Sequence, residues 1–338
     1  MLQWAKVSLV HTWADQAAMQ LLPRIKLYRS GFGDRTRLGR WVDEIAEYDR
    51  DVELPELSEL LGQRERVHGL LRRRRLRFAS PAARRLPRES AFIEAELLSP
   101  VRHAPRGACV LLAATGEEGF ARRRRFAAPL VRAGIAVLSL ENPFYGSRRP
   151  RGQIGPVLRT VEEQFAMNLS TVDEARALLA WLQRQGHSRL GVSGYSQGGM
   201  MAAFVGALSN APVACVPRGA GDRARAVFME SALSRSVDWA ALARDAGSAA
   251  EARAHFDRCL EPVRLSRHVA PLSPRSAIVV AARHDGFVPA AESEALHAHW
   301  PGSELRMLES GHVTAALFQA REHRHAIVDA FERLNASS

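Results

Sequence analysis

The stretch Arg189–Met201 reads RLGVSGYSQGGMM. It predicts a short buried β-strand, a sharp turn at Ser196 and a helix, because apolar residues flank the G-x-S-x-G pattern of residues 194–198. Gly194 and Gly198 have no Cβ atom, so the chain can pass close to the serine on both sides of a strained turn. The first N–H groups of the following helix would face an oxyanion formed at the serine. The stretch therefore predicts a nucleophilic serine at the end of a strand.

The composition indicates a globular protein. The chain has 338 residues, enough for one large domain or two small ones, and its hydrophobic content is 46%. No apolar run approaches the roughly 18 residues of a membrane-spanning helix. The N-terminal segment makes a poor secretory signal, because His11 and Asp15 interrupt its apolar patch. The three cysteines, Cys109, Cys215 and Cys259, are widely spaced and odd in number, so we expect a reducing compartment and a cytoplasmic protein.

The charge balance is strongly basic. The formal net charge is +11, and 45 of the 47 basic residues are arginine, because only Lys6 and Lys26 are lysines. Together with abundant alanine, this skew is typical of a genomic codon bias. No nucleic-acid-reading motif accompanies the charge, so we expect no nucleic-acid partner. The run Arg72–Arg75 is expected to lie at the solvated end of a helix, and the alternative is a surface for peripheral contact with an anionic membrane.

Residues 1–74 are expected to form an N-terminal helical extension. Apolar residues recur at helical spacing in Trp4–Leu22, around Leu38–Ile45 and again in Leu57–Leu71. The glycines of Gly31–Gly33 break the chain after the first of these segments.

From residue 75 onward, strand and helix patterns alternate. Strand-like segments, several of them continuous apolar runs, predict strands at Leu76–Ala79, Ala91–Leu98, Ala108–Ala114, Ile135–Leu140, Val213–Val216, Ala277–Ala282 and Glu304–Leu308. Amphipathic runs predict helices at 120–134, 161–185 and 313–334. The alternation predicts a mostly parallel sheet flanked by helices, with functional sites at the carboxyl ends of its strands. Residues 222–270 are expected to form a helical cap inserted between two core segments, 75–221 and 271–338.

Two residues fit as partners of the serine. A serine hydroxyl becomes a good nucleophile beside a base that is itself oriented by an acid. In α/β-hydrolases the acid and then the histidine follow the serine along the chain, each in a loop after a strand. Asp285 follows the Ala277–Ala282 strand, and His312 follows the Glu304–Leu308 strand. We therefore predict an α/β-hydrolase fold with a Ser196–Asp285–His312 triad.

Backbone N–H groups near the serine should bind the oxyanion. One belongs to Gln197, and the other to Thr115 or Gly116 in the loop after the Ala108–Ala114 strand. The run Arg122–Arg125 begins the next helix; it forms either an exposed helix face or a site for a phosphate or carboxylate of the substrate. The sequence has no convincing metal-ligand cluster and no nucleotide-binding loop, so we expect no metal and no cofactor.

Several islands of sequence form a specific set. They are Arg123–Gly146, Gly194–Gly199, Trp300–Gly302, Gly311–Phe318 and Asp329–Arg333. These islands resemble the α/β-hydrolase domain-containing protein eighteen family and its bacterial relatives. They extend from about residue 108 to residue 334, and the first 70 residues show little of the resemblance. The resemblance implies the same fold and the same triad, and it places the Glu141–Gly146 turn near the site.

The resemblance also implies a function. It favours a serine hydrolase of carboxylic esters, with lipid acyl esters as the preferred class of small-molecule substrate. The candidate substrate-binding residues are Arg123, Arg124, Tyr145 and Tyr195. Tyr195 and Gln197 differ from the family's residues around the nucleophile, so the shape of the pocket does not carry over. Two alternatives remain: a catalytically silent protein of this fold that binds lipids or partners, and a peptidase or thioesterase with the same triad. The oligomeric state is not predicted.

Overall fold

The computed structural model describes residues 15, 17, 20, 25–60 and 65–335. The strands are β1 (Arg66–His68), β2 (Leu71–Ala79), β3 (Phe92–Pro100), β4 (Gly107–Leu112), β5 (Ile135–Leu140), β6 (Leu190–Tyr195), β7 (Ala214–Arg218), β8 (Ile278–Ala282) and β9 (Glu304–Leu308). The helices are α2 (Arg35–Ala46), α3 (Ala121–Arg132), α4 (Val161–Arg184), α5 (Gln197–Ala207), α6 (Trp239–Ala246), α7 (Ala249–Leu260), α8 (Ala290–His299), α9 (His312–Phe318) and α10 (Ala320–Asn335).

Within these residues the nine strands form one sheet, in the order β1-β2-β3-β5-β4-β6-β7-β8-β9. The strands from β5 to β9 in this order are parallel, whereas β1, β2 and β3 extend one edge as antiparallel neighbours. The predicted mostly parallel sheet is therefore confirmed. Its central strands were predictable because they are buried along their whole length and are almost entirely apolar.

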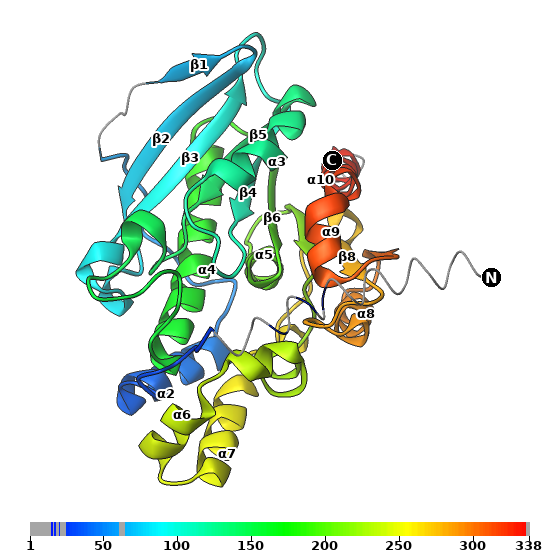
Figure 1. Ribbon diagram of the computed structural model, residues 1–338. Coiled ribbons are helices and arrows are strands. Elements are labelled where there is room, and N and C mark those ends of the chain that lie inside the picture. The colour runs from blue at the N-terminus through cyan, green and yellow to red at the C-terminus, as the bar shows by residue number, and fades with distance from the viewer. Residues whose placement is uncertain (1–14, 16, 18–19, 21–24, 61–64, 336–338) are drawn as a thin grey trace, which may run out of the picture.

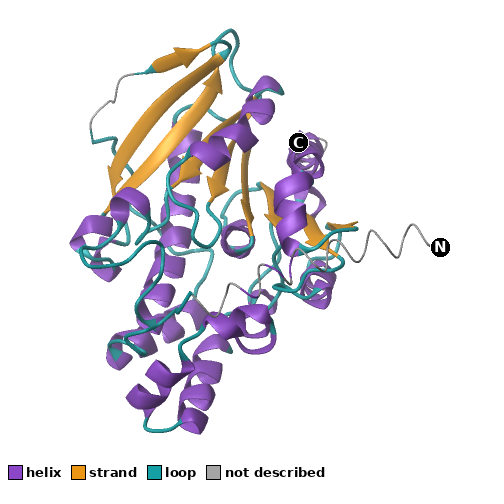
Figure 2. Ribbon diagram, in the orientation of Figure 1, coloured by secondary structure: helices purple, strands orange, loops and turns teal. Residues whose placement is uncertain are grey.

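Helices cover both faces of the sheet, as Figures 1 and 2 show. α3 and α10 pack on one face, and α4 and α5 pack on the other. Phe331 of α10 packs directly against the backbone of β4 and β6. A Cβ atom at Gly107 or Gly191 would lie 2.7 or 2.6 Å from its ring, so the two strands need glycine there. The predicted helix over 313–334 is interrupted at Gln319, and it forms α9 and α10.

The segment between β7 and β8 is helical, as expected for residues 222–270. It contains a π-helix (Ala226–Glu230) and the helices α6 and α7, which contact each other. α7 also contacts α2, so the insert lies against part of the N-terminal segment (Figure 1). The division of the chain into an extension, two core segments and a cap stays a prediction.

The helix expected over Leu57–Leu71 is wrong. Residues 66–68 and 71–79 are strands β1 and β2, so the predicted boundary after residue 74 falls inside a strand. Arg72–Arg75 therefore do not end a helix. Three of these arginines form ion pairs: Arg72 with Glu65 (3.1 Å), Arg74 with Glu59 (2.7 Å) and Arg75 with Glu96 (3.0 Å). The alkyl parts of these arginine side chains can lie along the strand while their guanidinium groups pair with carboxylates. A run of four arginines shows no helical periodicity.

The helix predicted around Leu38–Ile45 is α2, and Asp34 caps it by accepting a hydrogen bond from the Arg37 N–H (3.0 Å). The pattern in Trp4–Leu22 lies almost wholly outside the described residues. Of the helices that the structure describes, none has the length and apolar character needed to cross a bilayer.

Candidate active site

Ser196 lies in the turn between β6 and α5, as predicted. Its backbone has a φ of 57° and a ψ of −121°, a conformation that is unfavourable for a residue with a side chain. Two close approaches of the backbone explain the glycines on either side. A Cβ atom at Gly194 would lie 2.1 Å from the Gly198 carbonyl oxygen, and one at Gly198 would lie 2.6 Å from the Ala113 carbonyl oxygen. The strained turn lifts the serine hydroxyl out of the sheet edge.

His312 and Asp285 converge on this serine. The Nε2 atom of His312 lies 3.0 Å from the Ser196 hydroxyl, and the Nδ1 atom lies 2.6 Å from Oδ2 of Asp285. The other carboxylate oxygen of Asp285 accepts hydrogen bonds from the N–H groups of Phe287 (2.8 Å) and Val288 (2.7 Å). Because Nδ1–H donates to the carboxylate, Nε2 is free to accept the serine proton. The three side chains thus have the geometry of a nucleophile, a base and an acid that orients the base.

A carboxylate from the N-terminal segment binds both loops of the acid–base pair. Oδ2 of Asp15 accepts hydrogen bonds from the N–H groups of His312 (2.7 Å) and Gly286 (3.1 Å), and Oδ1 accepts one from Val313 (2.8 Å). Asp15 is only 1% exposed, and a Cβ atom at Gly311 would lie 2.7 Å from its Oδ2. The carboxylate therefore caps α9 and joins it to the loop of Asp285. In the sequence Asp15 is only a polar interruption of an apolar stretch, so no local signal pointed to this role.

Tyr195, predicted to bind substrate, instead supports the histidine. Its hydroxyl donates a hydrogen bond to the backbone carbonyl of His312 (2.5 Å), and its ring centroid lies 5.0 Å from that of the imidazole. Burial holds the pKa of the Tyr195 hydroxyl well above its usual value, so the hydroxyl stays a donor. The side chain points away from the opening beside Ser196, because successive strand residues face opposite sides of the sheet.

The predicted oxyanion loop lies beside the serine turn. The Thr115 hydroxyl donates a hydrogen bond to Oε1 of Gln197 (3.1 Å), which joins the two segments that carry the candidate backbone donors. Gly116 is the weaker of the two candidate oxyanion donors, because its N–H already interacts with the hydroxyl of Tyr145. Tyr145, predicted to bind substrate, does not line the pocket at Ser196: it is 1% exposed, and burial raises its pKa to about 12. It supports the loop from the protein interior.

Arg123 and Arg124 were also predicted to bind substrate, and neither lines the opening at Ser196. Arg123 is buried, and its guanidinium donates to the backbone carbonyls of Leu111, Leu140 and Gly119, which ties the ends of β4 and β5 to α3. Arg124 forms a two-pronged ion pair with Glu96 of β3, with both contacts at 2.8 Å. Four arginines in a row place successive side chains on different faces of a helix, so the run as a whole could not show which of them face a site.

A pocket opens beside Ser196 between α4, α5 and the helical insert. Its volume is about 640 Å³, counting the part open to solvent. Apolar side chains dominate it: Leu27, Met200, Met201, Val227, Phe228, Leu233 and Val288. Its polar side chains are mainly the hydroxyl of Thr115 and the amides of Gln164, Asn168 and Gln197, whereas the cationic Arg223 forms an ion pair with Glu292. The pocket is therefore suited to an uncharged, partly apolar group.

The amides of this pocket form a continuous network. Asn168 Oδ1 accepts hydrogen bonds from the side chains of Gln197 (2.9 Å) and Gln164 (2.9 Å), and Gln164 accepts one from the hydroxyl of Tyr28 (3.2 Å). Sequence reasoning missed Gln164 and Asn168. The available signal was their i, i+4 spacing, which puts two amides on one face of a helix that is otherwise largely buried.

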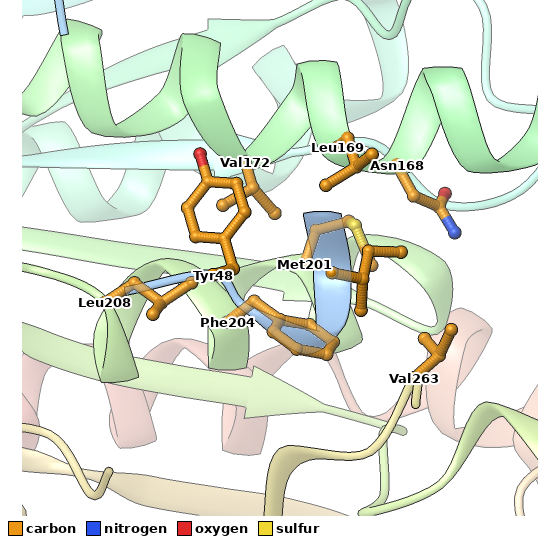
Figure 3. A pocket seen from close by; sticks show the side chains of 9 residues that line it. Tyr48, Asn168, Leu169, Val172, Met201, Phe204, Leu208 and Val263 are labelled. Carbon is orange, nitrogen blue, oxygen red and sulfur yellow. The ribbon is translucent and has the colours of Figure 1, made fainter. Parts of the chain in front are cut away.

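A second, apolar pocket adjoins the first. Figure 3 shows its lining side chains, which come from Ile45, Tyr48, Asn168, Leu169, Val172, Met201, Phe204, Leu208 and Val263. Its volume is about 310 Å³, again counting open space. Asn168 and Met201 line both pockets, so the second pocket lies directly behind the wall of the first.

The sheet order, the serine turn and the two later loops define an α/β-hydrolase fold, as the sequence predicts. A family model, alpha/beta hydrolase domain containing 18, matches residues 63–252 and 246–333. The chain belongs to this family, which confirms the resemblance noted in the sequence.

Solved structures show the same fold at low identity. Acetyl xylan esterase 1 from Thermoanaerobacterium sp. JW/SL YS485 is 15% identical, with a TM-score of 0.58 over 92% of this chain and 98% of its own. A cold-adapted esterase from an Arctic intertidal metagenomic library is 12% identical, with a TM-score of 0.51 over 81% and 99%. A structure from a study of two prolyl endopeptidases is 18% identical, with a TM-score of 0.51 over 79% of this chain and 39% of that one. Such similarity concerns the fold and does not choose between ester and peptide substrates.

Proposed function

We propose that this protein is a serine hydrolase of carboxylic esters. The single observation that carries the proposal is the convergence of Ser196, His312 and Asp285, with contacts of 3.0 and 2.6 Å at the end of a parallel sheet. In the proposed reaction the serine Oγ attacks the acyl carbonyl while His312 Nε2 takes its proton. His312 then protonates the leaving alcohol. In the second half of the reaction His312 takes a proton from water, the water attacks the acyl-enzyme, and His312 returns the proton to Ser196 as the acid is released.

The oxyanion of the tetrahedral intermediate would lie between α5 and the loop after β4. We assign the N–H of Gln197 as one donor and that of Thr115 as the other. No described residue accepts a backbone hydrogen bond from either group, so both are available. Loss of one such donor costs on the order of 3 kcal/mol of barrier. The side-chain contact between Thr115 and Gln197 supports the spacing of the two donors.

The pocket favours an uncharged acyl group with an apolar chain. Its amides are already hydrogen-bonded to one another, and its apolar side chains continue toward the second pocket of Figure 3. Entry of a long chain requires Met201 to move, since this flexible side chain lies between the two spaces. Lipid acyl esters are therefore the substrate class that we propose. We also propose that the protein acts in the cytoplasm and needs no metal or cofactor.

The first test is covalent labelling with a fluorophosphonate probe. Wild-type protein should be labelled and should hydrolyse p-nitrophenyl esters, whereas Ser196→Ala should do neither. Ser188→Ala is the matched control, because Ser188 is an exposed serine in the loop before β6. Equal labelling of wild type and Ser196→Ala would contradict the proposal. An unlabelled, well-folded wild type would favour the catalytically silent alternative.

Chain length provides the second test. The value of kcat/KM should rise from acetyl to octanoyl esters, and Val172→Phe, which fills the second pocket, should lower it about tenfold for octanoyl esters only. A uniform effect on all chain lengths would exclude this pocket as the acyl site. Parallel assays of thioesters and short peptides, and of esters presented on anionic liposomes, would separate the remaining substrate classes and test membrane contact.

A further inference from the structure

A second cavity lies on the opposite face of the sheet, between α3, α9, α10 and the ends of β4, β6 and β7. It has a volume of about 460 Å³, counting the part open to solvent. Its polar lining differs sharply from that of the pocket at Ser196, because it includes the guanidinium groups of three arginines and only one carboxylate. The polar residues in it are Arg122, Arg123, Arg218, Glu117, His323 and Tyr195.

Arg218, the last residue of β7, is the central feature of this cavity. It is only 5% exposed, yet no carboxylate of the described residues lies within ion-pair distance of it. Its Nε donates a hydrogen bond to the Ser193 hydroxyl (3.0 Å), and its guanidinium lies 4.4 Å from the ring centroid of Phe126. No described residue accepts a hydrogen bond from its two terminal nitrogens. Burial lowers the pKa of Arg218 to about 10, which reflects the cost of an unpaired buried cation.

The neighbouring charges do not neutralise Arg218. The single carboxylate, Glu117, already faces Arg123 (3.3 Å) and accepts a hydrogen bond from the Ala114 N–H (3.2 Å). Arg122 is exposed, has no ion-pair partner among the described residues, and repels Arg218. His323 adds no positive charge near neutral pH, because burial lowers its pKa to about 3. The cavity therefore holds two cations without counter-charge.

We propose that this cavity is a binding site for a small oxyanion, either a carboxylate or a phosphate, held by Arg218 with help from Arg122. A guanidinium presents paired N–H donors whose spacing matches two oxygens of such a group. The phenyl ring of Phe126 supports the flat face of Arg218, which leaves the edge with the terminal nitrogens for the ligand. Binding of the anion can be measured without ester hydrolysis, and the proposal goes beyond that function.

The site adjoins the candidate catalytic residues through Tyr195. The ring of Tyr195 lies 6.0 Å from the guanidinium of Arg218, and its hydroxyl binds the His312 carbonyl. A free solute and an acidic group carried by the substrate share this chemistry. Two kinds of measurement separate these sources: direct binding of a free anion, and turnover of a neutral ester compared with one that carries a carboxylate.

The test is binding of inorganic phosphate and of acetate to the full-length protein, by calorimetry and by thermal shift, against sodium chloride at matched ionic strength. We expect wild type to be stabilised by at least one of the two anions, and Arg218→Met to bind it at least tenfold more weakly. Arg40→Met is the control, because Arg40 is an exposed arginine of α2 and should leave binding unchanged. Equal binding by Arg218→Met and wild type, or no response beyond chloride, would overturn the proposal.

A second variant keeps the test decisive if Arg218→Met does not fold. Arg122→Gln alters an exposed side chain, so it should fold and should bind the anion several-fold more weakly; unchanged binding would count against the site. If Arg122→Gln lowers kcat/KM only for the carboxylate-bearing ester, the anion is part of the substrate. If it changes neither ester, the bound species is a free solute. Binding by the Ser196→Ala variant separates this site from the proposed hydrolysis.

Discussion

The strained turn at Ser196 is shaped mainly by residues next to it in the chain, although the Ser196 N–H also donates to the Arg218 carbonyl (2.8 Å), whereas His312 is held by residues 117 and 297 positions away. On the serine side, the strained backbone and the close passage of Gly194 and Gly198 belong to one strand–turn–helix unit. On the acid–base side, the hydroxyl of Tyr195 and the carboxylate of Asp15 hold loops that have little regular structure of their own. The comparison shows that one active site can combine a locally encoded half with a half that exists only after folding.

The serine half should tolerate no added atom at its closest approach. Gly194→Ala would put a methyl group 2.1 Å from the Gly198 carbonyl oxygen, and backbone at that point has no free rotation to relieve the contact. We expect no folded protein, or a loss of activity of more than about a thousandfold. Solubility, urea unfolding and ester hydrolysis would measure the effect.

Gly39→Ala is the matched control for that substitution. Gly39 lies in α2, and an added Cβ atom would meet nothing within 4 Å. This variant should keep full activity and gain about 0.5–1 kcal/mol in free energy of unfolding. Near-normal activity of Gly194→Ala would show that the turn is not as constrained as its geometry indicates.

The acid–base half should respond to Asp15, although this residue touches neither the serine nor the substrate pocket. Asp15→Ala removes the acceptor shared by the N–H groups of His312, Val313 and Gly286. A small displacement of the imidazole is enough to lower kcat by about 10- to 100-fold. Asp15→Asn keeps one acceptor oxygen and should fall between wild type and Asp15→Ala.

Asp43→Ala, at an exposed position of α2, serves as the control for loss of a carboxylate from the N-terminal region. The rate of fluorophosphonate labelling, measured beside the melting temperature, separates loss of positioning from loss of stability. An Asp15→Ala variant with wild-type kcat would show that the loops of Asp285 and His312 hold their geometry without this carboxylate.

The smallest effect concerns the acid stability of the region behind His312. His323 packs its ring 5.4 Å from that of Tyr195, and burial lowers its pKa from 6.5 to about 3. Between those two values the unfolded chain binds a proton that the folded protein does not. The stabilisation is therefore complete above pH 6.5 and is lost as the pH falls toward 3. His323→Gln should reduce the slope of the unfolding free energy against pH in this range by the equivalent of up to one proton. It should leave activity at pH 8 nearly unchanged.

Urea unfolding at pH 7, 5.5 and 4.5 would measure that slope. His325→Gln is the control, because His325 is an exposed histidine on the same helix, and it should leave the slope as in wild type. An unchanged slope in His323→Gln would mean that the buried ring binds a proton in the folded protein as readily as in the unfolded chain.

The errors of sequence-based reasoning follow the same division. Ser196, Asp285 and His312 were predictable, because each follows a strand of the parallel part of the sheet and parallel strands bring their carboxyl ends to one edge. The proposed substrate roles of Arg123, Arg124, Tyr145 and Tyr195 depended on side-chain direction. Direction is set by which face of a helix or strand meets the core, and the strings of like residues in this chain conceal it.

The strand-like segments and their order along the chain were enough to determine the parallel part of the sheet, the serine turn and the order of the three candidate catalytic residues, because these follow from local burial and backbone sterics. Tertiary structure alone decided that Asp15 binds the loops of Asp285 and His312, and that Tyr195 faces the histidine. It alone left Arg218 without a counter-charge in a cavity of its own. The physical reason is that hydrogen bonds and charges between distant segments depend on where the folded chain brings them, and no spacing in the sequence records that meeting.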